Sequence, residues 1–199
     1  MLFDGGYGSD VIRNTVRNVN LNGATSIDMQ GGFGDDVVIQ SLQKVTVNGG
    51  LNFNAAGGHD NDTMTFGATA GSKAIGFVPG LIVNSDARIS VDGGFGNDRL
   101  FGQVTPLISP TGSLDLAFIG GELNDVLNLQ LTLEPTSPTG ATSGPLTLTA
   151  LGGHGDDHLN LTIQNLGASA TPLSLNLDGG IGTDTATGAP DIDASDWTM

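Results

Sequence analysis

A glycine- and aspartate-rich segment that recurs seven times constrains the fold of this chain more than any other feature. Copies such as GGFGDDVVI, GGFGNDRLF and GGHGDDHLN align on a Gly-Gly pair. The seven pairs begin at Gly5, Gly31, Gly57, Gly93, Gly120, Gly152 and Gly179, at intervals of 26 to 36 residues. A repeat of this length is typical of solenoid proteins, in which every copy is one structural unit that stacks on the next.

Apolar residues recur at fixed distances from each pair. Two residues after the last aspartate of the motif stand Ile12, Val38, Met64, Leu100, Leu127, Leu159 and Ala186. Two residues before the pair stand Phe3, Met29, Ala55, Val91, Phe118, Ala150 and Leu177. Four residues before six of the pairs stand Ile27, Phe53, Ile89, Leu116, Leu148 and Leu175, and the position between these two columns is mostly polar. This alternation with period two is typical of β-strands that bury one face.

The pattern predicts an all-β fold, a right-handed parallel β-helix (β-solenoid) of about seven coils of 26–36 residues. We expect residues 1–199 to form one domain, with loop excursions near 67–80 and 134–145 and an acidic C-terminal tail at 189–199. A β-sandwich with similar turns is the alternative, but it does not explain why all seven copies keep one register.

The sixth motif position is an aspartate in every copy. These residues are Asp10, Asp36, Asp62, Asp98, Asp125, Asp157 and Asp184. Stacked carboxylates ~5 Å apart repel each other by several kcal/mol at an effective dielectric constant of ~20. A hard cation reverses this effect, and Ca²⁺ accepts carboxylate and backbone carbonyl oxygens together. In the alternative interpretation the turns are tight corners in which the aspartate side chains cap backbone N–H groups.

The motif resembles the haemolysin-type calcium-binding (RTX) nonapeptide, G-G-x-G-x-D-x-U-x, where U is a large apolar residue. The resemblance implies several Ca²⁺ ions in one row between stacked turns, in a protein that bacteria secrete and that folds with calcium. The implied aspartate ligands are Asp10, Asp36, Asp62, Asp98, Asp157 and Asp184. The implied carbonyl ligands belong to Gly6, Gly8, Gly32, Gly34, Gly94, Gly96, Gly153, Gly155, Gly180 and Gly182.

This chain departs from the family pattern in two ways. Family repeats run in tandem, whereas here one motif occurs in each long repeat, so we expect a larger coil with a single row of calcium ions. Two copies also lack the glycine at the fourth motif position. Asp60 replaces it in GGHDND and is a weaker candidate ligand, and Leu123 replaces it in GGELND, which makes the site at Asp125 weaker.

The third motif position holds Tyr7, Phe33, His59, Phe95 and His154 in five copies. We expect the flat rings to stack as a ladder rather than to take part in catalysis. Enzymatic activity is not expected, because the few Arg and Lys residues form no evident cluster. The alternative function is a carbohydrate-active or polysaccharide-binding β-helix, which a groove lined by Arg88, Arg99 and aromatic residues would favour.

Charge excludes several partners. The chain has 6 Lys and Arg against 21 Asp and Glu and a net charge of −15, so nucleic acid and anionic membranes are poor partners. It has no cysteine, and no apolar run is long enough for membrane insertion. We expect a secreted or cell-surface bacterial module with a structural or adhesive role and an export signal outside these residues. It would belong to a larger surface protein or associate end to end into a filament.

Overall fold

The computed structural model describes residues 1–68, 80–133, 144–165 and 172–188, and these residues form β-strands, turns and bends without a helix. Most of the two expected loop excursions (69–79 and 134–143) and the whole expected tail (189–199) lie outside the described residues. No helix in the described ranges has the length and apolar character needed to cross a membrane.

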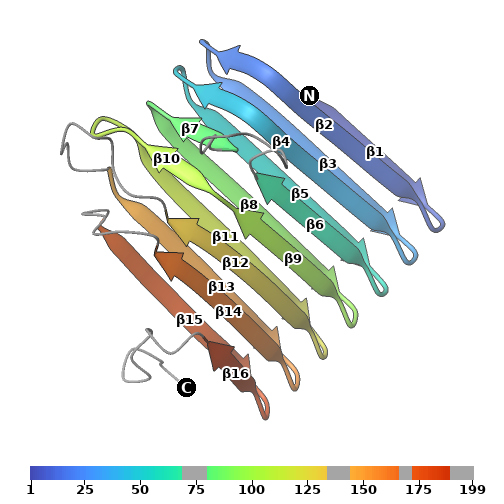
Figure 1. The fold of residues 1–199 in the computed structure, drawn as a ribbon. Helices are drawn as coiled ribbons and strands as arrows, with labels where there is room; N and C mark the ends of the chain where they lie inside the picture. The colour runs from blue at the N-terminus through green and yellow to red at the C-terminus, as the bar shows by residue number, and fades with distance from the viewer. Residues whose placement is uncertain (69–79, 134–143, 166–171, 189–199) are drawn as a thin grey trace.

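The strands form two parallel sheets (Figure 1). Sheet 1 contains, in spatial order, β1 (Leu2–Tyr7), β3 (Thr25–Phe33), β5 (Leu51–His59), β8 (Asp86–Phe95), β11 (Ser113–Glu122), β13 (Leu146–His154) and β15 (Leu173–Ile181). Sheet 2 contains β2 (Val11–Leu21), β4 (Val37–Val47), β6 (Thr63–Ala68), β7 (Leu81–Val83), β9 (Arg99–Val104), β10 (Pro106–Ile108), β12 (Val126–Leu133), β14 (His158–Asn165) and β16 (Thr185–Gly188). Each glycine motif connects a strand of sheet 1 to a strand of sheet 2, and in two copies a second strand of sheet 2 (β7 or β10) follows before the chain returns to sheet 1.

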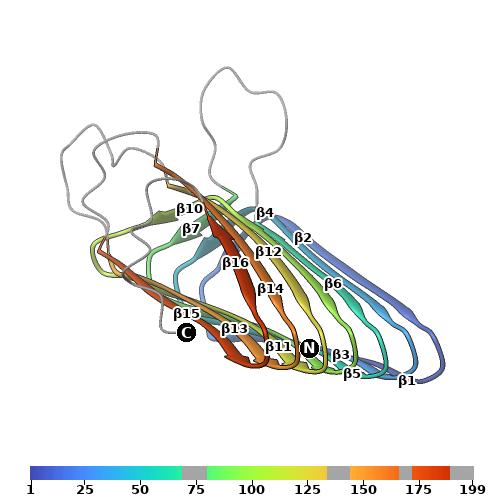
Figure 2. The ribbon, with the colours of Figure 1, turned by 90° about the horizontal axis from the view of Figure 1, so that it is seen from below.

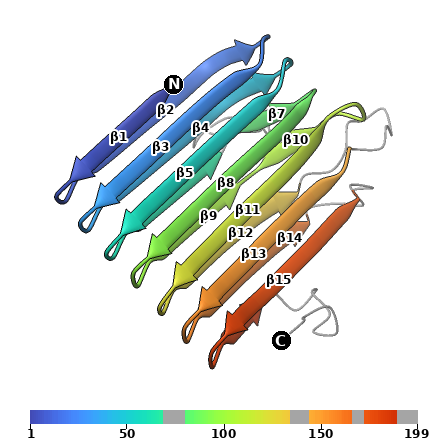
Figure 3. The ribbon, with the colours of Figure 1, turned by 180° about the vertical axis from the view of Figure 1, so that it is seen from behind.

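The pairing register follows the copies of the motif. The second glycine of each pair lies opposite its counterpart in the next copy, as in Gly6 with Gly32 and Gly32 with Gly58. Strand β4 is long enough to pair with two later strands, because β6 lies along its first half and β7 along its second half. Figure 3 shows the strands of sheet 1 following one another from the N-terminal to the C-terminal end. The prediction of an all-β fold with parallel strands is confirmed.

The core lies between the two sheets. Figure 2 shows that the sheets meet at the edge formed by the glycine turns and separate toward the opposite edge. The apolar columns of the sequence face this interior, and Met29, Met64, Ile89, Leu100 and Leu127 have no exposed surface. The end copies have a neighbour on only one side, so Phe3 and Ile12 are half-buried and Ala186 is exposed. The period-two pattern therefore identified the buried face correctly, and the position of each copy in the stack decides how deeply it is buried.

Candidate functional site

The glycine turns form a continuous edge along which one conformation is repeated. The second and fourth motif positions have positive φ angles, such as 115° at Gly32 and 108° at Gly34. A side chain at Gly32 would collide with the carbonyl oxygen of Gly6 in the preceding copy. Glycine is therefore required at the second position both for its φ angle and for the close approach of neighbouring backbones.

The motif aspartates lie just inside this edge and form a ladder of hydrogen bonds. The backbone N–H of Asp36 donates to Oδ1 of Asp62 at 2.8 Å, and the N–H of Asp62 donates to Oδ1 of Asp98 at 2.6 Å. The same bond continues in both directions, from Asp10 to Asp184, across all seven copies. The five central side chains (Asp36, Asp62, Asp98, Asp125 and Asp157) are each only 1% exposed. One oxygen of each carboxyl group from Asp36 to Asp184 thus caps a backbone N–H group, as the alternative interpretation of the motif anticipated.

The second carboxyl oxygen has no such partner. Oδ2 is buried without a hydrogen bond in Asp10, Asp36, Asp62, Asp98, Asp125 and Asp157. A buried carboxylate oxygen without a partner costs several kcal/mol unless a proton or a cation neutralises the group. The capping role therefore accounts for Oδ1 of these side chains but not for Oδ2.

A backbone carbonyl lies close to each of these oxygen atoms. A Cβ atom placed on Gly31 would meet both Oδ2 of Asp36, at 2.5 Å, and the carbonyl oxygen of Gly57 in the next copy. The same pair of atoms surrounds the first glycine of the other central copies. Hard cations take this combination of carboxylate and carbonyl oxygens. The sequence had singled out the second and fourth glycines, whereas the carbonyls beside Oδ2 belong to the first.

Burial favours the protonated form of the five central aspartates. It raises the pKa of Asp62 from 3.8 to about 7, and it raises that of Asp125 to about 7 and that of Asp98 to about 6. For Asp36 and Asp157 burial likewise raises the pKa. The hydrogen bond that each carboxylate accepts from a backbone N–H lowers the pKa and offsets part of this effect. These five aspartates are therefore harder to ionise than exposed ones unless a positive charge is bound.

A second ladder, which was missed in the sequence, lies at the fifth motif position. The backbone N–H of Asn61 donates to Oδ1 of Asp35 at 2.9 Å, and the N–H of Asn97 donates to Oδ1 of Asn61 at 2.9 Å. These bonds point toward the preceding copy, whereas those of the buried aspartates point toward the following copy. The signal was present, because five of the seven copies carry Asp or Asn at this position. This second ladder runs from the second copy to the seventh, so the turns of these copies are joined to their neighbours by both ladders.

The two altered copies keep the turn. Asp60 and Leu123 also adopt positive φ angles, of 78° and 79°, although these are smaller than the angles of the glycines at this position in the other copies, which range from 101° at Gly8 to 155° at Gly182. Oδ2 of Asp60 accepts a hydrogen bond from the N–H of Gly34 at 3.1 Å, so this side chain contacts the turn of the preceding copy. Asp125 has the same burial and the same unpartnered oxygen as its neighbours. The structure therefore does not separate Asp125 from the other aspartates, although the sequence ranked it lower.

The third motif position forms a ladder of rings on the outside of the turns. Tyr7, Phe33, His59 and Phe95 stack with centroid separations of 5.0, 4.5 and 5.0 Å and nearly parallel planes. The predicted stacking is confirmed for these four residues. The next copy has Glu122 at this position, and its Oε2 lies 3.0 Å from Nδ1 of His154. His154 is therefore paired with a carboxylate and does not continue the stack.

The described ranges contain no group of three or more acidic or histidine side chains that converges on one point as a metal site. A cation at the turns would thus depend on backbone carbonyls as well as on the aspartate column. Arg88 and Arg99 lie on different sheets, in β8 and β9, so they do not line one groove. Comparison of the chain with protein-family models, with curated proteins and with solved structures gave no match.

Proposed function

We propose that this protein is a calcium-stabilised structural module, a right-handed parallel β-helix of about seven coils. The alternation of the strands between two parallel sheets supports this architecture, since each passage through both sheets advances the chain by one copy of the motif. The row of glycine turns along one edge supports it as well (Figure 1).

The observation that carries the calcium proposal is the column of six buried Oδ2 atoms without a partner. A chain that needed only caps could use asparagine, whose side-chain oxygen accepts the same hydrogen bond without burying a charge. The fifth motif position uses Asn in three of its copies, whereas the sixth position is Asp in all seven. The negative charge itself is therefore the property that the sixth position requires, and calcium is the hard cation whose preferred ligands are present.

Calcium would be held by Oδ2 of the motif aspartates together with carbonyl oxygens of the glycine turns. When bound, it supplies the positive charge that allows adjacent buried carboxylates to ionise. Without it, the ionised carboxylates of the column repel one another, and this repulsion opposes the tight stacking of the turns. Binding is then coupled to folding, because the site forms only when neighbouring copies are stacked.

The biological role that fits this chemistry is structural or adhesive. The resemblance of the motif to secreted calcium-binding repeats supports a secreted or cell-surface bacterial protein, which meets calcium at high concentration outside the cell. Such a module would serve within a larger surface protein or in an end-to-end assembly. The net charge of −15 suits cationic partners rather than nucleic acid.

Circular dichroism and thermal denaturation test this proposal. We expect the β-sheet signal and the melting temperature of the purified protein to fall in excess EGTA and to recover when calcium is added in excess. Magnesium should restore much less, because it demands a smaller octahedral site and loses its water reluctantly. An unchanged spectrum and melting temperature in EGTA would show that the aspartate column needs no cation. Isothermal titration calorimetry would then give the number of calcium ions bound.

A further inference from the structure

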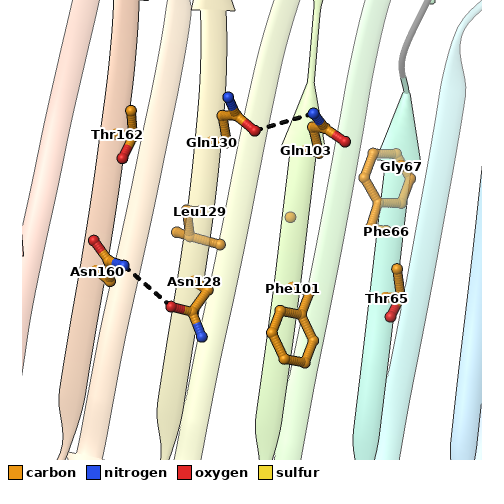
Figure 4. Close-up of a pocket in the computed structure, with 11 residues that line it drawn as sticks. Thr65, Phe66, Gly67, Phe101, Gln103, Asn128, Leu129, Gln130, Asn160 and Thr162 are labelled. Atoms are coloured by element: carbon orange, nitrogen blue, oxygen red, sulfur yellow. Dashed lines mark hydrogen bonds between the residues drawn. The ribbon is translucent and has the colours of Figure 1, made fainter. Parts of the chain in front are cut away.

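A hollow of about 500 Å³ lies on the outer face of sheet 2, away from the glycine turns. Four adjacent strands (β6, β9, β12 and β14) contribute the side chains that line it, as Figure 4 shows. Two rows of outward residues cross these strands. One row is Thr65, Phe101, Asn128 and Asn160, and the other is Gly67, Gln103, Gln130 and Thr162. The calcium proposal assigns no role to any of these residues.

The lining is rich in uncharged hydrogen-bonding groups. Nε2 of Gln103 donates to Oε1 of Gln130 at 3.0 Å, and Nδ2 of Asn160 donates to Oδ1 of Asn128 at 3.2 Å (Figure 4). Each bond uses the donor of one amide and the acceptor of the other, so every pair retains a donor and an acceptor for a ligand. The amides are also held in place by these bonds, which reduces the entropy lost when a ligand binds.

Two further features give the hollow its shape. Phe101 is 39% exposed, although burial of a phenylalanine side chain stabilises a folded protein. Beyond it, Gly67 lies at an outward position of β6, where an added Cβ atom would meet nothing within 4 Å. The missing side chain leaves open space opposite Gln103, in the row next to that of Phe101. A flat ligand can therefore rest on the ring while its edges contact the amides.

Charge narrows the class of ligand. None of the described residues that line the hollow carries a charge, and the protein as a whole is strongly acidic. An anionic polymer would be repelled by the overall field, and among the described residues of β6, β9, β12 and β14 only Arg99, two residues before Phe101 on the same face, offers a positive charge beside the hollow. An apolar ligand would leave the amides unpaired. A neutral ligand with many hydroxyl groups and apolar C–H faces satisfies both the amides and the ring.

We infer that this face of sheet 2 binds a neutral polysaccharide, with Phe101 stacking against a sugar ring and the Gln103–Gln130 and Asn128–Asn160 pairs binding its hydroxyl groups. The row of amides runs across the strands, which suits an extended chain of sugars rather than a single sugar. This inference does not rest on the calcium proposal, because the residues lie on a sheet face and not at the turns. It concerns binding and requires no catalytic group.

Native gel electrophoresis in calcium-containing buffer tests the inference. The gels contain one polymer each, and the neutral ones are hydroxyethyl cellulose, laminarin, galactomannan and dextran. Polygalacturonate and alginate serve as acidic polymers. We expect at least one neutral polymer to retard the protein relative to a gel without polymer, and the acidic polymers to have no such effect. Retardation by none of the neutral polymers, or by the acidic polymers alone, would overturn the inference.

Three variants locate the binding surface. Phe101→Ala should weaken binding about tenfold, the loss of one aromatic stacking contact. Gly67→Val should also weaken it, because the new side chain occupies open space, where its Cβ atom meets nothing within 4 Å. Phe33→Ala removes an exposed ring at the turns, 46% exposed, and should leave binding unchanged. Melting temperatures of the Gly67 and Phe101 variants close to that of the wild type confirm that they fold. Wild-type binding by both of these folded variants would place the ligand elsewhere.

Discussion

Replacing Asp98 with asparagine separates the two roles of the aspartate column. Asp98 lies in the middle of the column, and its Oδ1 accepts a hydrogen bond from the N–H of Asp62 at 2.6 Å. Its own N–H donates to Oδ1 of Asp125 at 2.8 Å, and this bond does not involve the side chain of Asp98. Asparagine keeps the oxygen that caps Asp62 and replaces only the buried Oδ2, which has no partner. The substitution therefore removes the charge and leaves the ladder in place.

Without calcium, Asp98→Asn should stabilise the protein. Carboxylates on neighbouring strands are ~4.8 Å apart, and two such charges repel by roughly 3 kcal/mol at an effective dielectric constant of ~20. The repulsion is best measured at about pH 8. This pH lies above the pKa of Asp98, about 6, and above those of Asp62 and Asp125, about 7, so all three carboxyl groups are ionised. A gain on the order of 2 kcal/mol raises the melting temperature of a protein of this size by roughly 4–8 °C.

With calcium, the same substitution should destabilise the protein. Removing one member of a buried charge pair costs about 3–5 kcal/mol, because the other charge is left without compensation. The change in melting temperature should therefore have opposite signs in EGTA and in calcium. Thermal denaturation followed by circular dichroism measures both values on one protein preparation.

The control is Asp115→Asn, which removes the same charge from an exposed position on β11. It should change the melting temperature little in either buffer, since an exposed charge, even one opposite Arg88 on the neighbouring strand, contributes little to stability. If Asp98→Asn shifts the melting temperature in the same direction and by the same amount in EGTA and in calcium, Oδ2 of Asp98 does not bind the cation. The aspartates would then be caps only.

Three further predictions concern the same edge of the protein. Leu123→Gly should stabilise the protein by about 1 kcal/mol in urea denaturation, because Leu123 has a φ angle of 79° and is 57% exposed. Leu123→Ala keeps the backbone strain and should show no gain in stability. Gly93→Ala should destabilise the protein by about 3 kcal/mol or more, since the new Cβ atom would lie 2.5 Å from Oδ2 of Asp98. Gly23→Ala should be tolerated, because its Cβ atom would meet nothing within 4 Å. Equal melting temperatures for the two variants would contradict this packing. In EGTA, stability should fall as the pH rises from about 4 through about 7. The pKa of Asp62 is raised from 3.8 to about 7 by folding, so in this range the folded protein retains a proton that the unfolded chain has released. A melting temperature that rises with pH in this range would refute the assignment.

The sequence was most informative where a pattern repeats. The apolar columns identified the buried faces, and the aligned Gly-Gly pairs identified the register, since Gly32 and Gly58 do lie opposite each other. Single departures from the pattern were harder to interpret. Leu123 is unfavourable in its conformation, yet the hydrogen bonds of the neighbouring turns hold it there, from the N–H of Asn124 to Asn97 and from that of Asp125 to Asp157. Tertiary context outweighs a local preference of ~1–2 kcal/mol for one residue.

The sequence by itself determined the all-β character, the parallel pairing of the strands, the register of the glycine motifs and the column of acidic side chains, because these depend on periodic spacing. Only the tertiary structure decided which carboxyl oxygen is capped and which is left without a partner. It also placed the first glycine carbonyl beside Oδ2, and it brought Gly67 and Phe101 together from different copies to shape the hollow. These features depend on which atoms of neighbouring strands approach one another, and a pattern of residue types along one chain does not contain that information.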